Sequence, residues 1–148
     1  MDDTWTLVTR RDIDLPVGRV WAAWSDPEKM AKWWGPAGFR STVTELDVSE
    51  GGRFEVVMHG PDGVDYPNVY VFDRVDPLRQ LVYTNVGSEQ FGLAPFQSVV
   101  DLEDVGKGTR VTLTARFASA EERRKHVEDF HAVEGSRELL QRLEEQAT

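Results

Sequence analysis

The chain has 148 residues, of which 26 are acidic and 17 basic, and its net charge of −9 disfavours binding to nucleic acid or to anionic membrane surfaces. It contains no cysteine, which excludes disulfide bonds and thiolate chemistry. A chain of this length buries roughly two-thirds of its unfolded surface. We therefore expect one domain over residues 1–148, with either a full core or a core and a cavity.

The N-terminal quarter predicts a strand followed by two short helices. Residues 1–4 are acidic, and no apolar segment suits a signal peptide or a membrane span, so we expect a cytoplasmic protein. Residues 5–12 alternate weakly between apolar and polar, which favours a strand. Pro16 suits the first turn of a helix, where a missing N–H costs nothing. Asp26 is expected to cap a second helix that carries Trp33 and Trp34 and ends at Gly35-Pro36.

From residue 40 onward the apolar period changes to two, which indicates strands. Short turns containing glycine, such as residues 50–52 and 60–63, separate these segments, so neighbouring strands must run antiparallel. The six expected strands cover residues 42–48, 53–59, 66–75, 81–84, 96–103 and 110–117.

The last predicted element is one long amphipathic helix. Ser119 is its expected N-cap, and Glu122 three residues later completes the pattern of a capping box. Gly135 interrupts the middle of this helix, and Ser136 lies near the centre of its apolar side, where a large residue is expected. One sheet with one such helix packs as an α+β unit of two layers.

A set of motifs runs in order over nearly the whole chain and includes two adjacent tryptophans before a Gly-Pro turn. The motifs are Pro16 with Val20-Trp21, Asp26-Pro27-Glu28, Trp33-Trp34-Gly35-Pro36, Asp47 with Gly51-Gly52-Arg53-Phe54, Gly60-Pro61-Asp62-Gly63, Tyr66-Pro67-Asn68, Ser119-Ala120-Glu121-Glu122-Arg123 and Glu134-Gly135. In this order they resemble the START-like, or SRPBCC, superfamily. Within it they are similar to the bacterial relatives of the activator of the ninety-kilodalton heat-shock protein ATPase.

This resemblance implies a helix-grip fold, in which a curved, seven-stranded antiparallel sheet wraps around the long C-terminal helix. Two short helices follow the first strand, and a pocket lies between the sheet and the long helix. The family's link to a heat-shock chaperone implies a role in the stress response. The eukaryotic activator carries a separate N-terminal chaperone-binding domain for which we expect no room in 148 residues, so chaperone activation does not follow automatically from the resemblance.

The resemblance implies that the pocket binds a small, largely hydrophobic molecule. One alternative is an enzyme that resembles the cyclases and dehydratases of this fold, with Arg53, Tyr66 and Tyr70 as its candidate acid–base and oxyanion groups. Another alternative is a module that contacts a chaperone or forms a homodimer. Relatives usually carry an aromatic residue where Ser136 stands, so we expect Ser136 to border an enlarged pocket.

The candidate ligand-binding residues come from alternation in the strands, from the apolar side of the last helix and from their positions in the family. They are Trp33, Trp34, Arg53, Phe54, Met58, Tyr66, Tyr70, Phe130, Val133, Ser136 and Leu140. Adjacent residues on a helix point about 100° apart, so Trp33 and Trp34 cannot face one pocket equally. The alternative for this pair is that both rings belong to the core.

The sequence offers no strong signal for a metal, a cofactor or a catalytic nucleophile. His126 and His131 are five residues apart, which does not place two ligands on one face of a helix, and His59 is far from both in sequence. No Gly-x-Ser-x-Gly motif or phosphate-binding glycine loop occurs. We therefore expect no metal and no cofactor, and we assign no catalytic residue.

Overall fold

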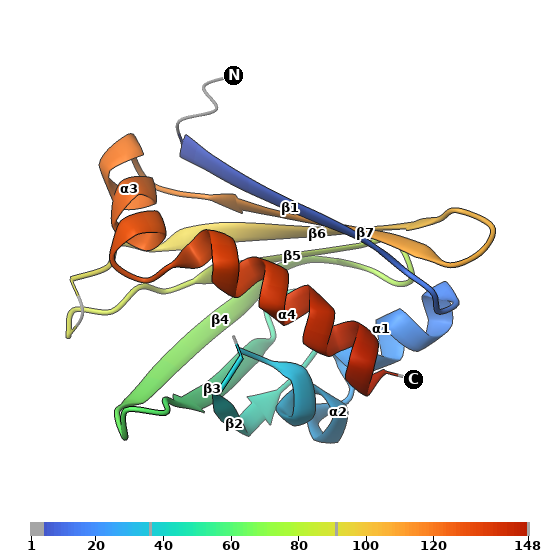
Figure 1. Cartoon of the computed structure of the whole chain (residues 1–148), viewed down its shortest axis with the longest axis horizontal. Helices are drawn as coiled ribbons and strands as arrows, with labels where there is room; N and C mark the ends of the chain where they lie inside the picture. The colour runs from blue at the N-terminus through green and yellow to red at the C-terminus, as the bar shows by residue number, and fades with distance from the viewer. Residues whose placement is uncertain (1–4, 36, 91, 148) are drawn as a thin grey trace.

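A computed structural model describes residues 5–35, 37–90 and 92–147 and confirms the predicted α+β fold (Figure 1). Residues 1–4 and Pro36, which the sequence analysis used, lie outside the described residues. The strands are β1 (Thr6–Ile13), β2 (Arg40–Leu46), β3 (Arg53–His59), β4 (Asp65–Asp76), β5 (Gln80–Asn85), β6 (Phe96–Asp104) and β7 (Thr109–Arg116). The helices are α1 (Val17–Ser25), α2 (Pro27–Trp33), α3 (Ala120–Glu128) and α4 (Ala132–Gln146).

The seven strands form one antiparallel sheet in the order β1-β7-β6-β5-β4-β3-β2. Strands β2 to β7 each pair with their neighbours in sequence. β1 pairs with β7 along its whole length and forms one edge of the sheet. The register shifts between Val43 and Glu45 in β2 and between Phe72 and Arg74 in β4. Such bulges bend and twist a strand, which agrees with the curvature of the sheet around α4.

The helices lie on one face of the sheet, and α4 crosses that face (Figure 1). α1 and α2 lie at one end of α4, and α3 lies at the other end. The predicted caps are present: a side-chain oxygen of Asp26 accepts from the N–H of Glu28 at 2.9 Å, and that of Ser119 accepts from the N–H of Glu122 at 3.1 Å. In the described part of the chain, no helix is both long and apolar enough to cross a membrane.

The prediction of one continuous C-terminal helix is wrong at residues 129–131. The chain leaves the helix after Glu128, and His131 adopts a left-handed conformation (φ 53°) before α4 begins at Ala132. Gly135 therefore lies in the first turns of α4 and not in the middle of a long helix. The break places Phe130 between two helices, where its side chain is 41% exposed.

The two halves of α4 have different surroundings. Leu140 and Leu143 in its C-terminal half are fully buried and pack in the core with Trp24, Trp33 and Val20 of the short helices. The N-terminal half presents Ala132, Gly135 and Ser136 instead of large side chains. Close packing in the first region and small residues in the second leave a space at the end of the sheet near α3.

Candidate functional site

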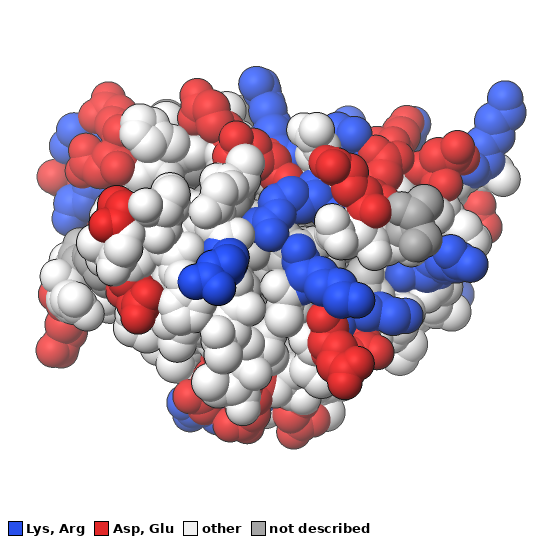
Figure 2. Space-filling model, turned by 60° about the horizontal axis from the view of Figure 1, so that its bottom comes forward, with Lys and Arg blue, Asp and Glu red and all other residues white. Residues whose placement is uncertain are grey.

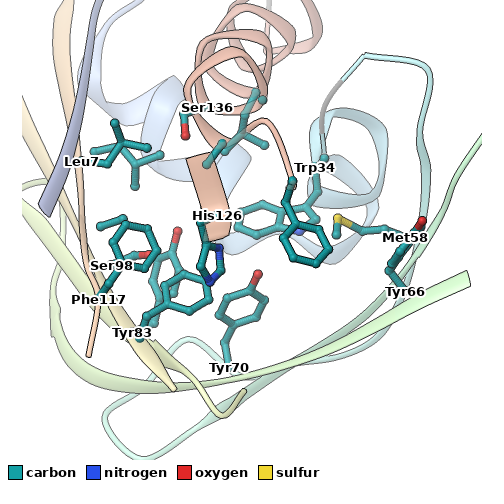
Figure 3. Close-up of a pocket in the computed structure, with 18 of the residues that line it drawn as sticks. Leu7, Trp34, Met58, Tyr66, Tyr70, Tyr83, Ser98, Phe117, His126 and Ser136 are labelled. Atoms are coloured by element: carbon teal, nitrogen blue, oxygen red, sulfur yellow. The ribbon is translucent and has the colours of Figure 1, made fainter. Parts of the chain in front are cut away.

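A cavity of about 270 Å³ lies between the sheet and the N-terminal half of α4. Figure 3 shows Ser136 and Leu7 on one side of this space, Tyr70 and Tyr83 on the opposite side, and Trp34 with Met58 at one end. The lining residues come from six strands, the helices and the loops beside them. They are Leu7, Trp34, Gly35, Phe39, Met58, Tyr66, Tyr70, Tyr83, Phe96, Ser98, Leu113, Ala115, Phe117, His126, Phe130, Ala132, Gly135, Ser136 and Leu139.

A second cavity of about 180 Å³ adjoins the first on the side of β4 and the loop before β6. Asn68, Asn85 and Ser88 bring amide and hydroxyl groups to its wall. Its lining shares six side chains with the first cavity, namely Met58, Tyr66, Tyr70, Phe96, His126 and Phe130. A molecule that displaces one of these shared side chains would reach both spaces.

The adjacent tryptophans at the end of α2 have different environments. Trp33 is fully buried, and its indole N–H donates to the carbonyl of Ala23 at 3.0 Å. Trp34 lines the cavity and packs edge-on against Phe54 and Tyr70, with ring centroids 5.0 and 5.7 Å away. The pair was expected either to face the pocket or to belong to the core, and each expectation describes one ring. Trp33 belongs to the core, and Trp34 forms part of the cavity wall.

The structure brings together six of the eleven candidate ligand-binding residues on the cavity wall. They are Trp34, Met58, Tyr66, Tyr70, Phe130 and Ser136. The other five do not line it. Trp33 and Leu140 are fully buried in the core, Phe54 stacks behind Tyr70 at 5.3 Å, and Val133 is partly exposed elsewhere on α4. Arg53 is exposed and pairs with Glu55 at 3.1 Å.

Thirteen lining residues were not among the candidates, and several had a signal that was available in the sequence. Strands β6 and β7 alternate regularly, so Phe96, Ser98, Leu113 and Ala115 follow from period two once the covered face of the sheet is known. His126 had no such signal, because its burial depends on the break in the chain that follows α3. Among the described residues, no cluster of three or more His, Asp or Glu side chains is suited to a metal ion.

The polar atoms of the cavity belong mainly to hydroxyl groups that keep their protons at neutral pH. Burial raises the pKa of Tyr70 to about 12, and contact with Asn85 opposes this only in part. Burial also raises the pKa of Tyr83 well above its ordinary value. Both phenols are therefore hydrogen-bond donors and not bases. Among the described residues, no Asp, Glu, Lys or Arg lines either cavity.

A hollow on the outside of the molecule has a different chemistry. It lies where α1, α2 and the end of α4 meet, and Arg19, Lys29 and Lys32 line it together with Gln146. Figure 2 shows several basic side chains near the middle of the face that it draws, with acidic side chains around them. This hollow offers charge but little apolar wall, so it does not suit the same ligand as the cavity.

The chain is similar to one protein family and to several solved structures. The family model described as Activator of Hsp90 ATPase homolog 1-like protein matches residues 14–147. A protein from Mycobacterium smegmatis is 30% identical, with a TM-score of 0.87 over 99% of this chain and 92% of that chain. A protein from Nitrosomonas europaea is 28% identical, with a TM-score of 0.85 over 99% and 96% of the two chains. An Arthrobacter aurescens protein is 27% identical, with a TM-score of 0.89 over 99% and 88%. None of the curated proteins matches.

Proposed function

This chain belongs to the family of Activator of Hsp90 ATPase homolog 1-like proteins, and on that premise we propose that it binds a small, largely hydrophobic molecule in the cavity beneath α4. The observation that carries the proposal is the cavity itself. Its volume of about 270 Å³ is close to the lower end of ordinary ligand pockets. Its wall is mostly aromatic and aliphatic, with a few polar groups, as in sites that bind apolar ligands and orient them.

The small residues on α4 explain why the space stays open. A large side chain at Ser136 would project into the cavity, because Ser136 lines it and is only partly buried. Natural cores rarely retain voids of this size unless something fills them. A ligand that occupies the space in the cell accounts for an opening that packing alone would have closed.

The experiment is a fluorescence titration with N-phenyl-1-naphthylamine, an uncharged apolar probe. Wild-type protein should give a saturable increase in probe fluorescence at one site. Ser136→Phe should weaken binding by tenfold or more, because the ring fills the cavity, and overpacking typically costs only 1–3 kcal/mol of stability. Gln141→Phe, at an exposed position on the same helix, is the control and should bind as the wild type does.

Two outcomes of this titration would reject the proposal: no saturable binding to the wild type, or equal binding by Ser136→Phe while that variant stays folded.

Catalysis is less well supported, because Arg53 lies off the cavity wall that Tyr66 and Tyr70 share. Ligand binding is compatible with a homodimer or with a complex with the cognate Hsp90. Light scattering and a pull-down test these two possibilities separately.

A further inference from the structure

His126 of α3 carries a buried polar atom without a partner. The residue is 8% exposed, and among the described residues nothing forms a hydrogen bond with its Nε2. Phe117 and Phe96 enclose the imidazole, with ring centroids 4.6 and 4.7 Å away. An unsatisfied buried group of this kind typically costs 1–3 kcal/mol, so a binding partner for Nε2 is expected.

The imidazole belongs to the wall of both cavities, and neighbouring side chains cover its Nε2, so a ligand reaches this atom when one of them moves aside. His126 lines both cavities, and Figure 3 shows its ring among the other labelled side chains of the cavity. Burial lowers the pKa of His126 below its ordinary value of 6.5, so the ring is neutral at pH 7 and above. A neutral imidazole has one nitrogen that donates and one that accepts.

The charges around the cavities restrict the ligand further. The described lining of both cavities contains no Asp, Glu, Lys or Arg side chain that would neutralise a charged ligand. Glu122, one turn before His126 on α3, also has a buried oxygen without a partner, and its charge acts on His126. Lys125, the cation on α3 that also acts on His126, pairs with the other oxygen of Glu122 at 3.6 Å and does not line either cavity. A carboxylate ligand would therefore enter an apolar space whose described lining holds no cation, which is costly.

We propose that the ligand is an uncharged, mostly apolar molecule that carries a hydroxyl group, and that Nε2 of His126 forms the hydrogen bond with this hydroxyl. The inference rests on the proposed function of the cavity. A hydroxyl both donates and accepts, so it pairs with either tautomer of the neutral imidazole. The apolar part of the molecule lies against Trp34, Phe39 and Leu113, which line the same space.

Three related probes test the inference by calorimetry at pH 7.5: naphthalene, 1-naphthol and 1-naphthoate. Wild-type protein should bind 1-naphthol about three- to tenfold more tightly than naphthalene, as expected for one added hydrogen bond. It should bind 1-naphthoate more weakly than either. Equal affinities for naphthalene and 1-naphthol, or a preference for the carboxylate, would overturn the inference.

Variants of the histidine assign this preference to His126. His126→Phe should bind naphthalene as the wild type does but lose the advantage of 1-naphthol, whereas His126→Gln should retain part of it. His59→Phe is the matched control, since His59 contacts Thr42 and Asp65 on the other face of β3 and does not line the cavities. A full preference for 1-naphthol in folded His126→Phe would contradict the role given to Nε2.

A second measurement covers the case in which His126→Phe does not fold. In wild-type protein, the imidazole ¹⁵N resonance of His126 Nε2 should shift on binding 1-naphthol and not on binding naphthalene, and an unchanged resonance would overturn the inference. If no naphthalene derivative binds at all, the cavity proposal itself fails. If naphthalene binds without any preference for the hydroxyl, only the inference about His126 fails.

Discussion

Trp33 and Trp34 are adjacent in sequence but differ in what their rings contact. Trp33 is sealed in the core by the two short helices and forms a hydrogen bond with Ala23, whereas Trp34 faces the cavity. Trp33 is the last residue of α2, whereas Trp34 is its C-cap and has an extended backbone (ψ 138°), so the chain changes direction between the two side chains. Trp33 therefore contributes to the stability of the fold, and Trp34 contributes to the wall of the candidate site.

Conservative substitutions should separate these two roles. Trp33→Phe leaves the carbonyl of Ala23 without its donor and should lower the free energy of unfolding by about 1–3 kcal/mol. It should not change the affinity for N-phenyl-1-naphthylamine. Trp34→Phe should alter the affinity for the probe, because it reshapes the wall. Urea unfolding and probe titration measure both, and a loss of affinity confined to Trp33→Phe would contradict the assignment.

At the scale of single residues, the sequence predicted part of the site for a clear reason. Met58, Tyr66 and Tyr70 follow from alternation, because period two places them on the covered face of the sheet. Alternation does not reveal which inward residues meet α4 and which pack elsewhere, so Phe54 was included although it lies behind Tyr70. His126 was missed because its burial depends on the break that follows α3.

Among the elements, α4 and the segment after α2 are joined by one side chain. The guanidinium of Arg142 donates to the carbonyls of Gly35, Trp34 and Lys32 at 2.8, 3.2 and 3.1 Å. These carbonyls lie at the C-terminal end of α2, where a cation also stabilises the helix dipole. Because Gly35 and Trp34 line the cavity, Arg142 also holds that part of the wall in place.

Removal of this cation should loosen the end of α2. Arg142→Met should lower the free energy of unfolding by about 1–3 kcal/mol, because it leaves backbone carbonyls without their charged donor. Amide hydrogen exchange should increase selectively in residues 33–41. Arg137→Met, at an exposed position of the same helix, is the control and should change neither quantity. If amide exchange in residues 33–41 were the same in Arg142→Met as in Arg137→Met, Arg142 would not hold this segment.

The elements were predictable where local signals were strong and uncertain where long-range contacts decide. Asp26 and Ser119 cap helices as expected, because capping depends on a few neighbouring residues. The break at His131 was not predictable, since the apolar spacing continues through it and no Gly or Pro marks it. The pairing of β1 with β7 was not predicted, because it joins residues about a hundred positions apart and no local signal marks it.

For the molecule as a whole, the buried histidine couples stability to pH. Burial lowers the pKa of His126 in the folded state below the value of 6.5 that applies to the unfolded chain. Between these two values the unfolded state binds more protons, so the free energy of unfolding rises with pH in this window. The contribution of neutral His126 to the free energy of unfolding is complete above about pH 6.5 and is lost as the pH falls through the pKa of His126 in the folded state.

The expected result is a decrease in the unfolding free energy of wild-type protein between pH 7.5 and 5.5. Glu122 and Lys125 act on His126 from the same helix in opposite directions, and both remain in the variant. His126→Phe should therefore show a smaller decrease over this range, whereas His59→Phe should behave as the wild type does. Urea unfolding at several pH values measures this, and an equal slope in His126→Phe would exclude His126 as its cause.

The central claim is that the space between the sheet and α4 is the binding site of this protein. The most direct measurement is a map of backbone amide chemical shifts in ¹⁵N-labelled protein during titration with N-phenyl-1-naphthylamine. The account predicts that the largest shifts surround Tyr70, Ala115 and Ser136, which line the cavity from β4, β7 and α4. Shifts confined to the exposed end of β1 or to the basic hollow around Lys29 and Lys32 would contradict it.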